Sequence, residues 1–333
     1  MPAVLITPEA MRDVDGPYVA LLRKAGFDVR YPRNPHLARG SCGEEETVAE
    51  LTGIDASIAS AESYSATVLE ALPDLRVIAR CGVGYDRVDV AAATARRVPV
   101  TITPTSNHEA VAELTLALML AVSKSIVAND QQVRSGAWPR DLPMPVRGKT
   151  LGVVGLGRIG GSLAARARAL GMKVVAFETQ PNTVFLRAHQ IELVEFDELL
   201  SCSDYVSIHC PLNDSTHGMF DKDAFAKMRP GSVFINTARG HLVVEEDLIG
   251  ALRSGHLRGA GLDVYEQEPP SPDNPLFRME NVVLSPHIAG TDESSLEAMG
   301  VEAAECIVNL YEGRWPDGAV VNQVLQTGWT WEG

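Results

Sequence analysis

The stretch LGVVGLGRIGGSLAARARALGMKVVAFETQ, residues 151–180, decides the fold class of this chain. Its first four residues are an apolar run typical of a strand, and the glycine pattern G-x-G-x-x-G follows at residues 155–160. A helix-like run over 162–170 ends at Gly171, and a second strand-like run covers 173–177. A strand, a glycine turn, a helix and a second strand in this order predict a dinucleotide-binding unit. The alternative is a glycine turn in another kind of α/β protein.

The glycine loop and the acid that follows it predict which dinucleotide is bound. Gly155, Gly157 and Gly160 allow a tight turn and a close approach of backbone to pyrophosphate, at a helix N-terminus that attracts phosphate. Glu178 closes the second strand, about twenty residues on, where a carboxylate can bind ribose hydroxyls. Residues 179–181 contain no Arg or Lys for a 2′-phosphate, so we expect NAD rather than NADP.

Composition indicates a globular protein of two domains. The chain has 333 residues, of which 45% are hydrophobic and 22% charged, values that suit two domains of ordinary size. We expect no membrane span, because no run of about 18 apolar residues occurs, and no signal peptide. The five cysteines are scattered and form no C-x-x-C pair, so we expect reduced thiols, a cytoplasmic location and no metal cluster. The net charge of −14 argues against nucleic acid as a main partner.

Short apolar runs alternate with helical patterns on both sides of the glycine unit, which predicts parallel sheets covered by helices. The expected strands cover 4–7, 27–31, 56–60, 77–79, 98–102, 192–194, 205–209, 232–236, 259–264 and 282–285. The expected helices cover 9–25, 44–52, 65–71, 88–96, 195–201, 222–227, 244–254 and 294–312.

Residues 107–134 form the longest predicted helix. Thr105, Ser106 or Asn107 can cap it, and its middle, 114–122, is apolar on all sides. Such a helix must be buried on most faces. We favour a subunit interface over a purely internal helix.

Three side chains that can carry chemistry follow strands of the second half. Arg239, Glu268 and His287 each come after an apolar run, and parallel sheets place ligands at the carboxyl ends of their strands. Arg can hold a carboxylate with two hydrogen bonds, His can exchange a proton near neutral pH, and Glu can orient His. The alternatives are a surface cation, a solvated loop acid and a helix-entry histidine, and spacing alone does not prefer His287 to His209.

Seven segments carry a resemblance to a known family. They are GVGYD (82–86), NHEAVAE (107–113), LGVVGLGRIG (151–160), HCPLNDSTHGMF (209–220), FINTARGHLVVEEDL (234–248), GLDVYEQEP (261–269) and LSPHIAG (284–290). Over about residues 76–290 the chain resembles the D-isomer-specific 2-hydroxyacid dehydrogenases, the group that contains phosphoglycerate, glycerate and hydroxypyruvate enzymes.

The resemblance implies roles for individual residues. His287 would be the acid–base group, Glu268 its partner, and Arg239 the group that binds the substrate carboxylate or carbonyl. The loop of Gly82, Val83 and Gly84 would help to hold the carboxylate. The cofactor contacts would come from Gly155, Gly157, Arg158, Ile159, Gly160, Glu178, Cys210, Pro211, Thr216, Thr237, Ala238, Asp263, His287 and Ala289, with Asp263 near the nicotinamide amide.

The resemblance also implies an architecture of two Rossmann-like, doubly wound domains. A split, flavodoxin-like substrate domain would comprise residues 1–102 and 291–333, and an inserted NAD-binding domain residues 103–290. The active site would lie in the cleft, and a homodimer is expected. No domain follows residue 333 in this sequence, so control by a bound amino acid is not expected.

Departures from the family pattern bear on the substrate. Relatives that bind phosphorylated substrates often carry a base after the third strand, whereas residues 59–63 here read ASAES, with one acid and no base. Arg87 could partly compensate. We therefore expect a small unphosphorylated 2-oxo acid. The alternatives are 3-phosphoglycerate dehydrogenase activity and a non-enzymatic NAD-sensing protein like the corepressors that share this fold. Formate oxidation is disfavoured, because formate dehydrogenases of the family carry Gln where Glu268 stands.

Overall fold

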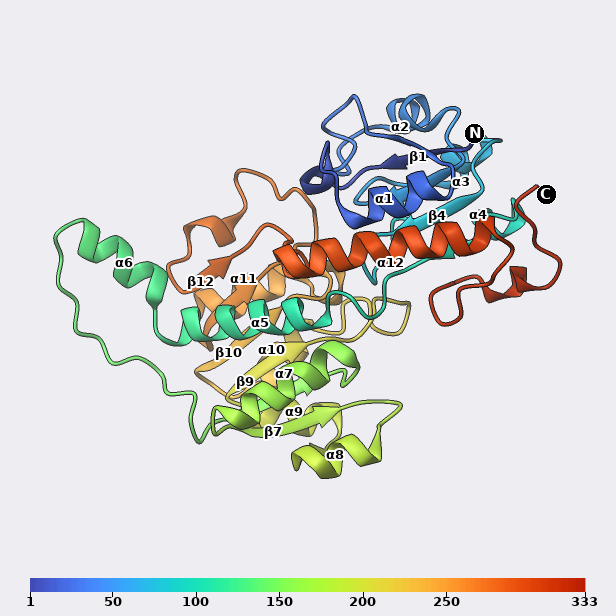
Figure 1. Cartoon of the computed structure of the whole chain (residues 1–333). Coiled ribbons are helices and arrows are strands. Elements are labelled where there is room, and N and C mark those ends of the chain that lie inside the picture. Colours follow the sequence, from blue (N-terminus) through green and yellow to red (C-terminus); the bar gives the residue numbers. More distant parts are fainter. Residues whose placement is uncertain (333) are drawn as a thin grey trace. The chain divides into compact units, whose positions relative to one another are not determined.

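The computed structural model describes residues 1–332, which form two compact units. One unit comprises Met1–Asn107 and Thr291–Gly333, and the other His108–Gly290 (Figure 1). The sequence-based boundaries were 102/103 and 290/291. The observed division lies five residues later at the first of these, directly before the helix that begins at His108.

The first unit is built on a five-stranded parallel sheet in the order β2-β1-β3-β4-β5. Strands β1 and β3 consist of buried residues only, because helices cover both faces of the sheet. The strands are β1 (Ala3–Ile6), β2 (Asp28–Arg30), β3 (Ala56–Ala59), β4 (Val77–Arg80) and β5 (Val100–Thr101). The helices are α1 (Pro17–Lys24), α2 (Glu44–Leu51), α3 (Ala66–Glu70), α4 (Val90–Ala95) and α12 (Glu293–Tyr311), with short 3₁₀ turns η1 (Glu9–Met11) and η4 (Gln323–Gln326).

The second unit contains a seven-stranded parallel sheet in the order β12-β11-β10-β9-β6-β7-β8. Its strands are β6 (Thr150–Val154), β7 (Lys173–Phe177), β8 (Glu192–Leu193), β9 (Tyr205–Ile208), β10 (Ser232–Asn236), β11 (Leu257–Leu262) and β12 (Val282–Leu284). Its helices are α5 (His108–Ser123), α6 (Ile126–Arg134), α7 (Arg158–Ala169), α8 (Thr183–His189), α9 (Phe196–Cys202), α10 (Lys222–Lys227) and α11 (Glu245–Arg253), with turns η2 (Gly240–Leu242) and η3 (Pro275–Arg278). Both units are thus doubly wound α/β structures, as predicted.

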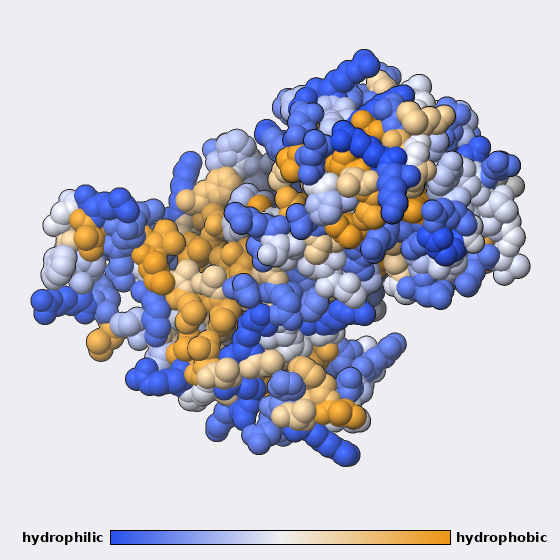
Figure 2. Space-filling model, in the orientation of Figure 1, coloured by the Kyte–Doolittle hydropathy of each residue, from blue (hydrophilic) through white to orange (hydrophobic). Residues whose placement is uncertain are grey.

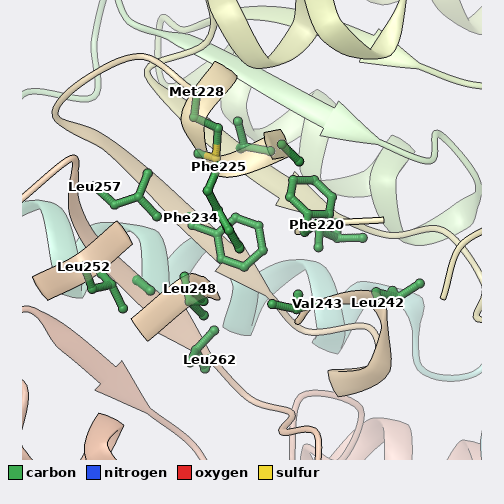
Figure 3. Packing of buried hydrophobic residues seen from close by; sticks show 14 of the residues in the cluster. Phe220, Phe225, Met228, Phe234, Leu242, Val243, Leu248, Leu252, Leu257 and Leu262 are labelled. Carbon is green, nitrogen blue, oxygen red and sulfur yellow. The ribbon is translucent and has the colours of Figure 1, made fainter. Parts of the chain in front are cut away.

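Aromatic and aliphatic side chains fill one face of the second sheet. Phe220, Phe225 and Phe234 are at most 1% exposed, and their ring centroids lie 5.1–6.0 Å apart (Figure 3). Leu248 and Leu252 of α11 pack against the same cluster. This core fixes β9, β10 and β11, whose carboxyl ends carry several of the predicted site residues.

The predicted helix over 107–134 was wrong as a single helix. The structure has two helices, α5 and α6, bent by 57° at Lys124 and Ser125. Ser125 adopts the left-handed conformation with φ of 50°, which ends α5. In Figure 1 α6 and the long segment that follows it extend away from the other helices of their unit. Within residues 1–332 no single helix has the length and apolarity to cross a membrane; the bent α5–α6 pair meets that test only when joined.

The structure differs from the predicted elements in two further places. The expected helix over 9–25 is a 3₁₀ turn, an irregular segment and then α1, because Gly16 has extended backbone and Pro17 favours the first turn of a new helix. Helix α8 was not predicted, since none of its residues is buried and its sequence therefore lacks a clear apolar stripe.

Candidate active site

The glycine loop follows β6 and turns directly into α7. Gly155 has φ of 92°, and a side chain there would meet the backbone of His209 at 2.7 Å. A side chain on Gly160 would lie 2.1 Å from the carbonyl oxygen of Gly155. Both positions therefore require glycine. Gly157, in contrast, has open space where a Cβ would stand, and it is the residue before the first turn of α7.

This open space lies at a helix N-terminus whose first N–H groups have no partners within the helix. The predicted contacts Arg158 and Ile159 form the first turn of α7. Glu178, at the end of β7, accepts hydrogen bonds from the N–H of Leu156 at 2.7 Å and of Gln180 at 2.9 Å. A fixed carboxylate beside the glycine loop suits ribose hydroxyls and repels a 2′-phosphate, so these residues fit NAD.

The other predicted cofactor residues lie in two segments. Cys210, Pro211 and Thr216 belong to the turn after β9, where the Thr216 hydroxyl donates to the Pro211 carbonyl at 2.7 Å. Thr237, directly after β10, is buried and its hydroxyl lies 2.8 Å from that of Thr115 on α5. Ala238 donates its N–H to the side chain of Asn236 at 3.0 Å.

Arg239, Glu268 and His287 follow the adjacent strands β10, β11 and β12, respectively. The structure brings His287 and Glu268 into contact, with 2.7 Å between Nδ1 and Oε2. The other oxygen of Glu268 accepts the N–H of Tyr265 at 3.0 Å. Because Nδ1 of His287 is engaged, Nε2 is the ring nitrogen left to meet another group. This arrangement orients an imidazole for proton transfer.

Charge keeps Glu268 ionised. Burial raises the pKa of Glu268, but the hydrogen bond and charge of His287, the N–H of Tyr265 and the charge of Arg239 together hold it below its ordinary value. His209 is a contrasting histidine, because burial lowers its pKa to about 3. The environment therefore distinguishes the two histidines: His209 stays neutral, whereas His287 is half exposed and paired with a carboxylate.

The loop that carries His287 is held by the buried Asp263 at the end of β11. One carboxylate oxygen lies 2.5 Å from the Ser285 hydroxyl and accepts the N–H of Ile288 at 3.0 Å, and the other accepts the N–H of Ala289 at 2.8 Å. His287 itself has φ of 55°, a backbone conformation that needs support from its surroundings.

Sequence reasoning missed two parts of this support. It did not anticipate that Asp263 would hold the His287 loop, although an acid within the predicted strand at 259–264 was a visible signal. It also missed Tyr265, whose hydroxyl donates to the carbonyl of Ser285 at 2.9 Å. No sequence signal distinguishes that tyrosine from a core residue.

In the first unit, residues 82–84 form a turn after β4. The Arg80 Nε donates to the carbonyl of Gly84 at 3.0 Å, and the carbonyl of Gly82 accepts the N–H of Thr103 at 3.0 Å. Glu62, the one acid among residues 59–63 of the neighbouring loop, is 1% exposed. It points into the protein, because Thr7 and other donors surround its carboxylate there.

The fold and site define a class: a doubly wound dinucleotide-binding protein with an Arg–Glu–His constellation at the strand ends. The statistical model of the family described as "D-isomer specific 2-hydroxyacid dehydrogenase, NAD binding domain" matches residues 116–289. The chain belongs to this family, and its second unit contains the family's NAD-binding domain.

Several relatives support this membership. The chain is 44% identical over 276 residues to the D-3-phosphoglycerate dehydrogenase of Mycobacterium leprae, covering 80% of this chain and 52% of that one. It is 38% identical over 271 residues to the glyoxylate reductase of Korarchaeum cryptofilum, covering 80% and 82%. The chain thus spans about half the length of the phosphoglycerate dehydrogenase relatives. The TT0316 protein of Thermus thermophilus has a similar structure, with a TM-score of 0.84 and 36% identity, over 96% of this chain and all of that one.

Proposed function

We propose that this protein is an NAD-dependent dehydrogenase that interconverts a small D-2-hydroxy acid and its 2-oxo acid. The observation that carries the proposal is the 2.7 Å contact of His287 with Glu268, in a chain whose NAD-binding domain belongs to this family. A histidine oriented by a carboxylate suits the proton transfer that must accompany reduction of a carbonyl.

Bound NADH would supply the hydride. His287 Nε2 would donate a proton to the substrate carbonyl oxygen, while Glu268 fixes the orientation of the ring through Nδ1. Arg239 would bind the substrate carboxylate and polarise the carbonyl, since a guanidinium can make two parallel hydrogen bonds. The first unit would serve as the substrate domain, with residues 82–84 offering backbone N–H groups to the carboxylate.

The same assignment gives the cofactor contacts their roles. The glycine loop and α7 would hold the pyrophosphate, Glu178 the adenosine ribose, and the turn after β9 the adenine side. Thr237, Ala238, Asp263 and Ala289 would surround the nicotinamide, with Asp263 also supporting the loop of His287.

We propose an unphosphorylated substrate, of which glyoxylate and hydroxypyruvate are the simplest examples. The loop after β3 carries no Lys or Arg at residues 59–63, so it offers no cation of its own to a phosphate. The similarity to glyoxylate reductases over 82% of the relative's length agrees with this choice. Oxidation of 3-phosphoglycerate is the second candidate, supported by the 44% identity to the M. leprae enzyme.

A substrate panel tests the proposal. We expect NADH to be oxidised at neutral pH with glyoxylate, hydroxypyruvate or 2-oxobutyrate, with higher kcat/KM than with phosphohydroxypyruvate. Faster turnover of the phosphorylated acid would favour the second candidate. Tight NADH binding without turnover of any acid would favour a non-enzymatic sensor.

We also propose a cytoplasmic homodimer whose interface lies on the second unit. Leu114, Leu116 and Leu120 of α5 are only half-buried, and Figure 2 shows an orange area over the part of the view that contains α5 and β12. The segment of residues 126–142, here called the α6 segment, consists of α6 and the residues that follow it. It adds the exposed apolar residues Ile126, Val127, Val133, Trp138 and Leu142. Large exposed apolar areas mark association sites. The partners proposed are thus a small organic acid and a second copy of the chain, with neither nucleic acid nor membrane.

A further inference from the structure

Glu62 is a carboxylate buried at the carboxyl end of the first sheet. It is 1% exposed and lies beyond the ends of β1 and β3, between which the direction of strand order reverses. The hydroxyl of Thr7 lies 2.8 and 3.0 Å from its two oxygens, and the N–H of Ser60 donates at 2.9 Å. The hydroxyl of Tyr64 donates at 3.1 Å. Open α/β sheets bind ligands at such reversal points, and here a side chain of the protein itself fills the position.

The segment that carries Glu62 runs beside the loop proposed to bind the substrate carboxylate. Cys81 donates its N–H to the carbonyl of Ala59 at 2.8 Å, where the loop begins. Tyr64 donates its N–H to the carbonyl of Arg87 at 2.8 Å, where the loop ends. Residues 59–64 therefore support residues 81–87 at both ends.

Arg80 connects the two segments. It is paired in register with Ala59 across β3 and β4, and its Nε donates to the carbonyl of Gly84 within the loop. Burial raises the pKa of Glu62, and the charge of Arg80 is the largest cause that opposes this rise. Arg80 thus donates to the loop through its Nε, and its charge acts on the buried carboxylate of Glu62.

We propose that Glu62 is a specificity-determining residue: its carboxylate offsets the charge of Arg80 behind the loop, so that the loop favours a singly charged acid over its phosphorylated counterpart. The inference rests on the proposed role of residues 82–84. A cation left without this offset would attract a phosphate more strongly than a carboxylate, because the phosphate carries more charge.

Binding of D-glycerate and 3-phospho-D-glycerate to the 333-residue chain saturated with NADH tests the proposal. The two ligands differ only in the phosphate, and a hydroxy acid cannot react with reduced cofactor, so calorimetry gives Kd without turnover. In Glu62→Gln, which keeps the shape and removes the charge, we expect the affinity for the phosphorylated ligand to rise at least about fivefold relative to D-glycerate. Glu70→Gln, an equal charge change at an exposed residue of the same unit, should leave the ratio within about twofold.

Arg80→Gln provides a second variant in case Glu62→Gln does not fold. This variant should bind both ligands more weakly. Its affinity for 3-phospho-D-glycerate relative to D-glycerate should fall at least about threefold, opposite to the change expected in Glu62→Gln. A general loss of structure would lower the affinity for both ligands equally. The NADH affinity of each variant checks whether its second unit is folded. The proposal is overturned if neither ligand binds the wild type, or if the ratio is unchanged in the folded variants. Absence of turnover with an intact shift in ratio would reject the proposed function alone.

Discussion

At the residue scale, the contact of Glu268 with His287 has a predictable pH dependence. The folded-state pKa of Glu268 lies below its ordinary value of 4.5. The stability it contributes is therefore fully present above about pH 4.5 and is lost as pH falls through the folded pKa.

We expect Glu268→Gln to lower the free energy of unfolding by about 1 kcal/mol near pH 6, a value reduced because His287 is half exposed. The difference between wild type and variant should shrink as the pH is lowered below about 4.5 and through the folded-state pKa of Glu268. Urea unfolding at several pH values measures it. A difference that grows towards acid would contradict the assignment.

The residues of the site show what a sequence can reveal. The glycine positions were predictable, because Gly155 and Gly160 have backbone contacts that exclude a side chain and so belong to a recognisable pattern. Predicting that His287 pairs with Glu268 required the family resemblance, because the two residues are nineteen positions apart. Spacing alone did not prefer His287 to His209. The buried orientation of Glu62 was not predictable, because it depends on Thr7, fifty-five residues distant in sequence.

At the element scale, strands were predicted well because apolar runs bounded by turns must be buried in a parallel sheet. The junction of α5 and α6 was missed for a physical reason. The sequence Ser-Lys-Ser at 123–125 contains neither Gly nor Pro, and a left-handed serine leaves no signature.

The same junction provides a prediction. Ser125 is exposed and left-handed, so a β-branched side chain strains the backbone without changing core packing. Ser125→Val should lower the free energy of unfolding by about 1–2 kcal/mol, whereas Ser125→Gly should be neutral or slightly stabilising. Thermal unfolding compares both with Gln131→Val, an exposed position inside α6. Equal effects of Ser125→Val and Gln131→Val would contradict a specific requirement at the junction.

At the scale of the whole molecule, the proposed dimer gives a mass prediction. The wild type should sediment with twice the chain mass of 35.8 kDa. Val127→Asp with Leu142→Asp places two charges on exposed apolar residues of the α6 segment and should favour the monomer.

Val324→Asp is the matched control, because Val324 is an apolar residue of the first unit whose exposure of 75% lies between those of Val127 and Leu142. Sedimentation equilibrium of the three proteins separates the outcomes. A monomeric wild type, or dissociation by the control as well, would reject this interface.

The central claim is that His287 transfers the proton in an NAD-dependent reduction. The most direct measurement compares kcat of wild type, His287→Gln and the exposed His217→Gln on the best 2-oxo acid, with NADH affinity determined on each preparation. The account predicts a loss of about 10²–10⁴-fold in kcat for His287→Gln, unchanged NADH affinity, and full activity for His217→Gln. Wild-type kcat in His287→Gln would contradict it.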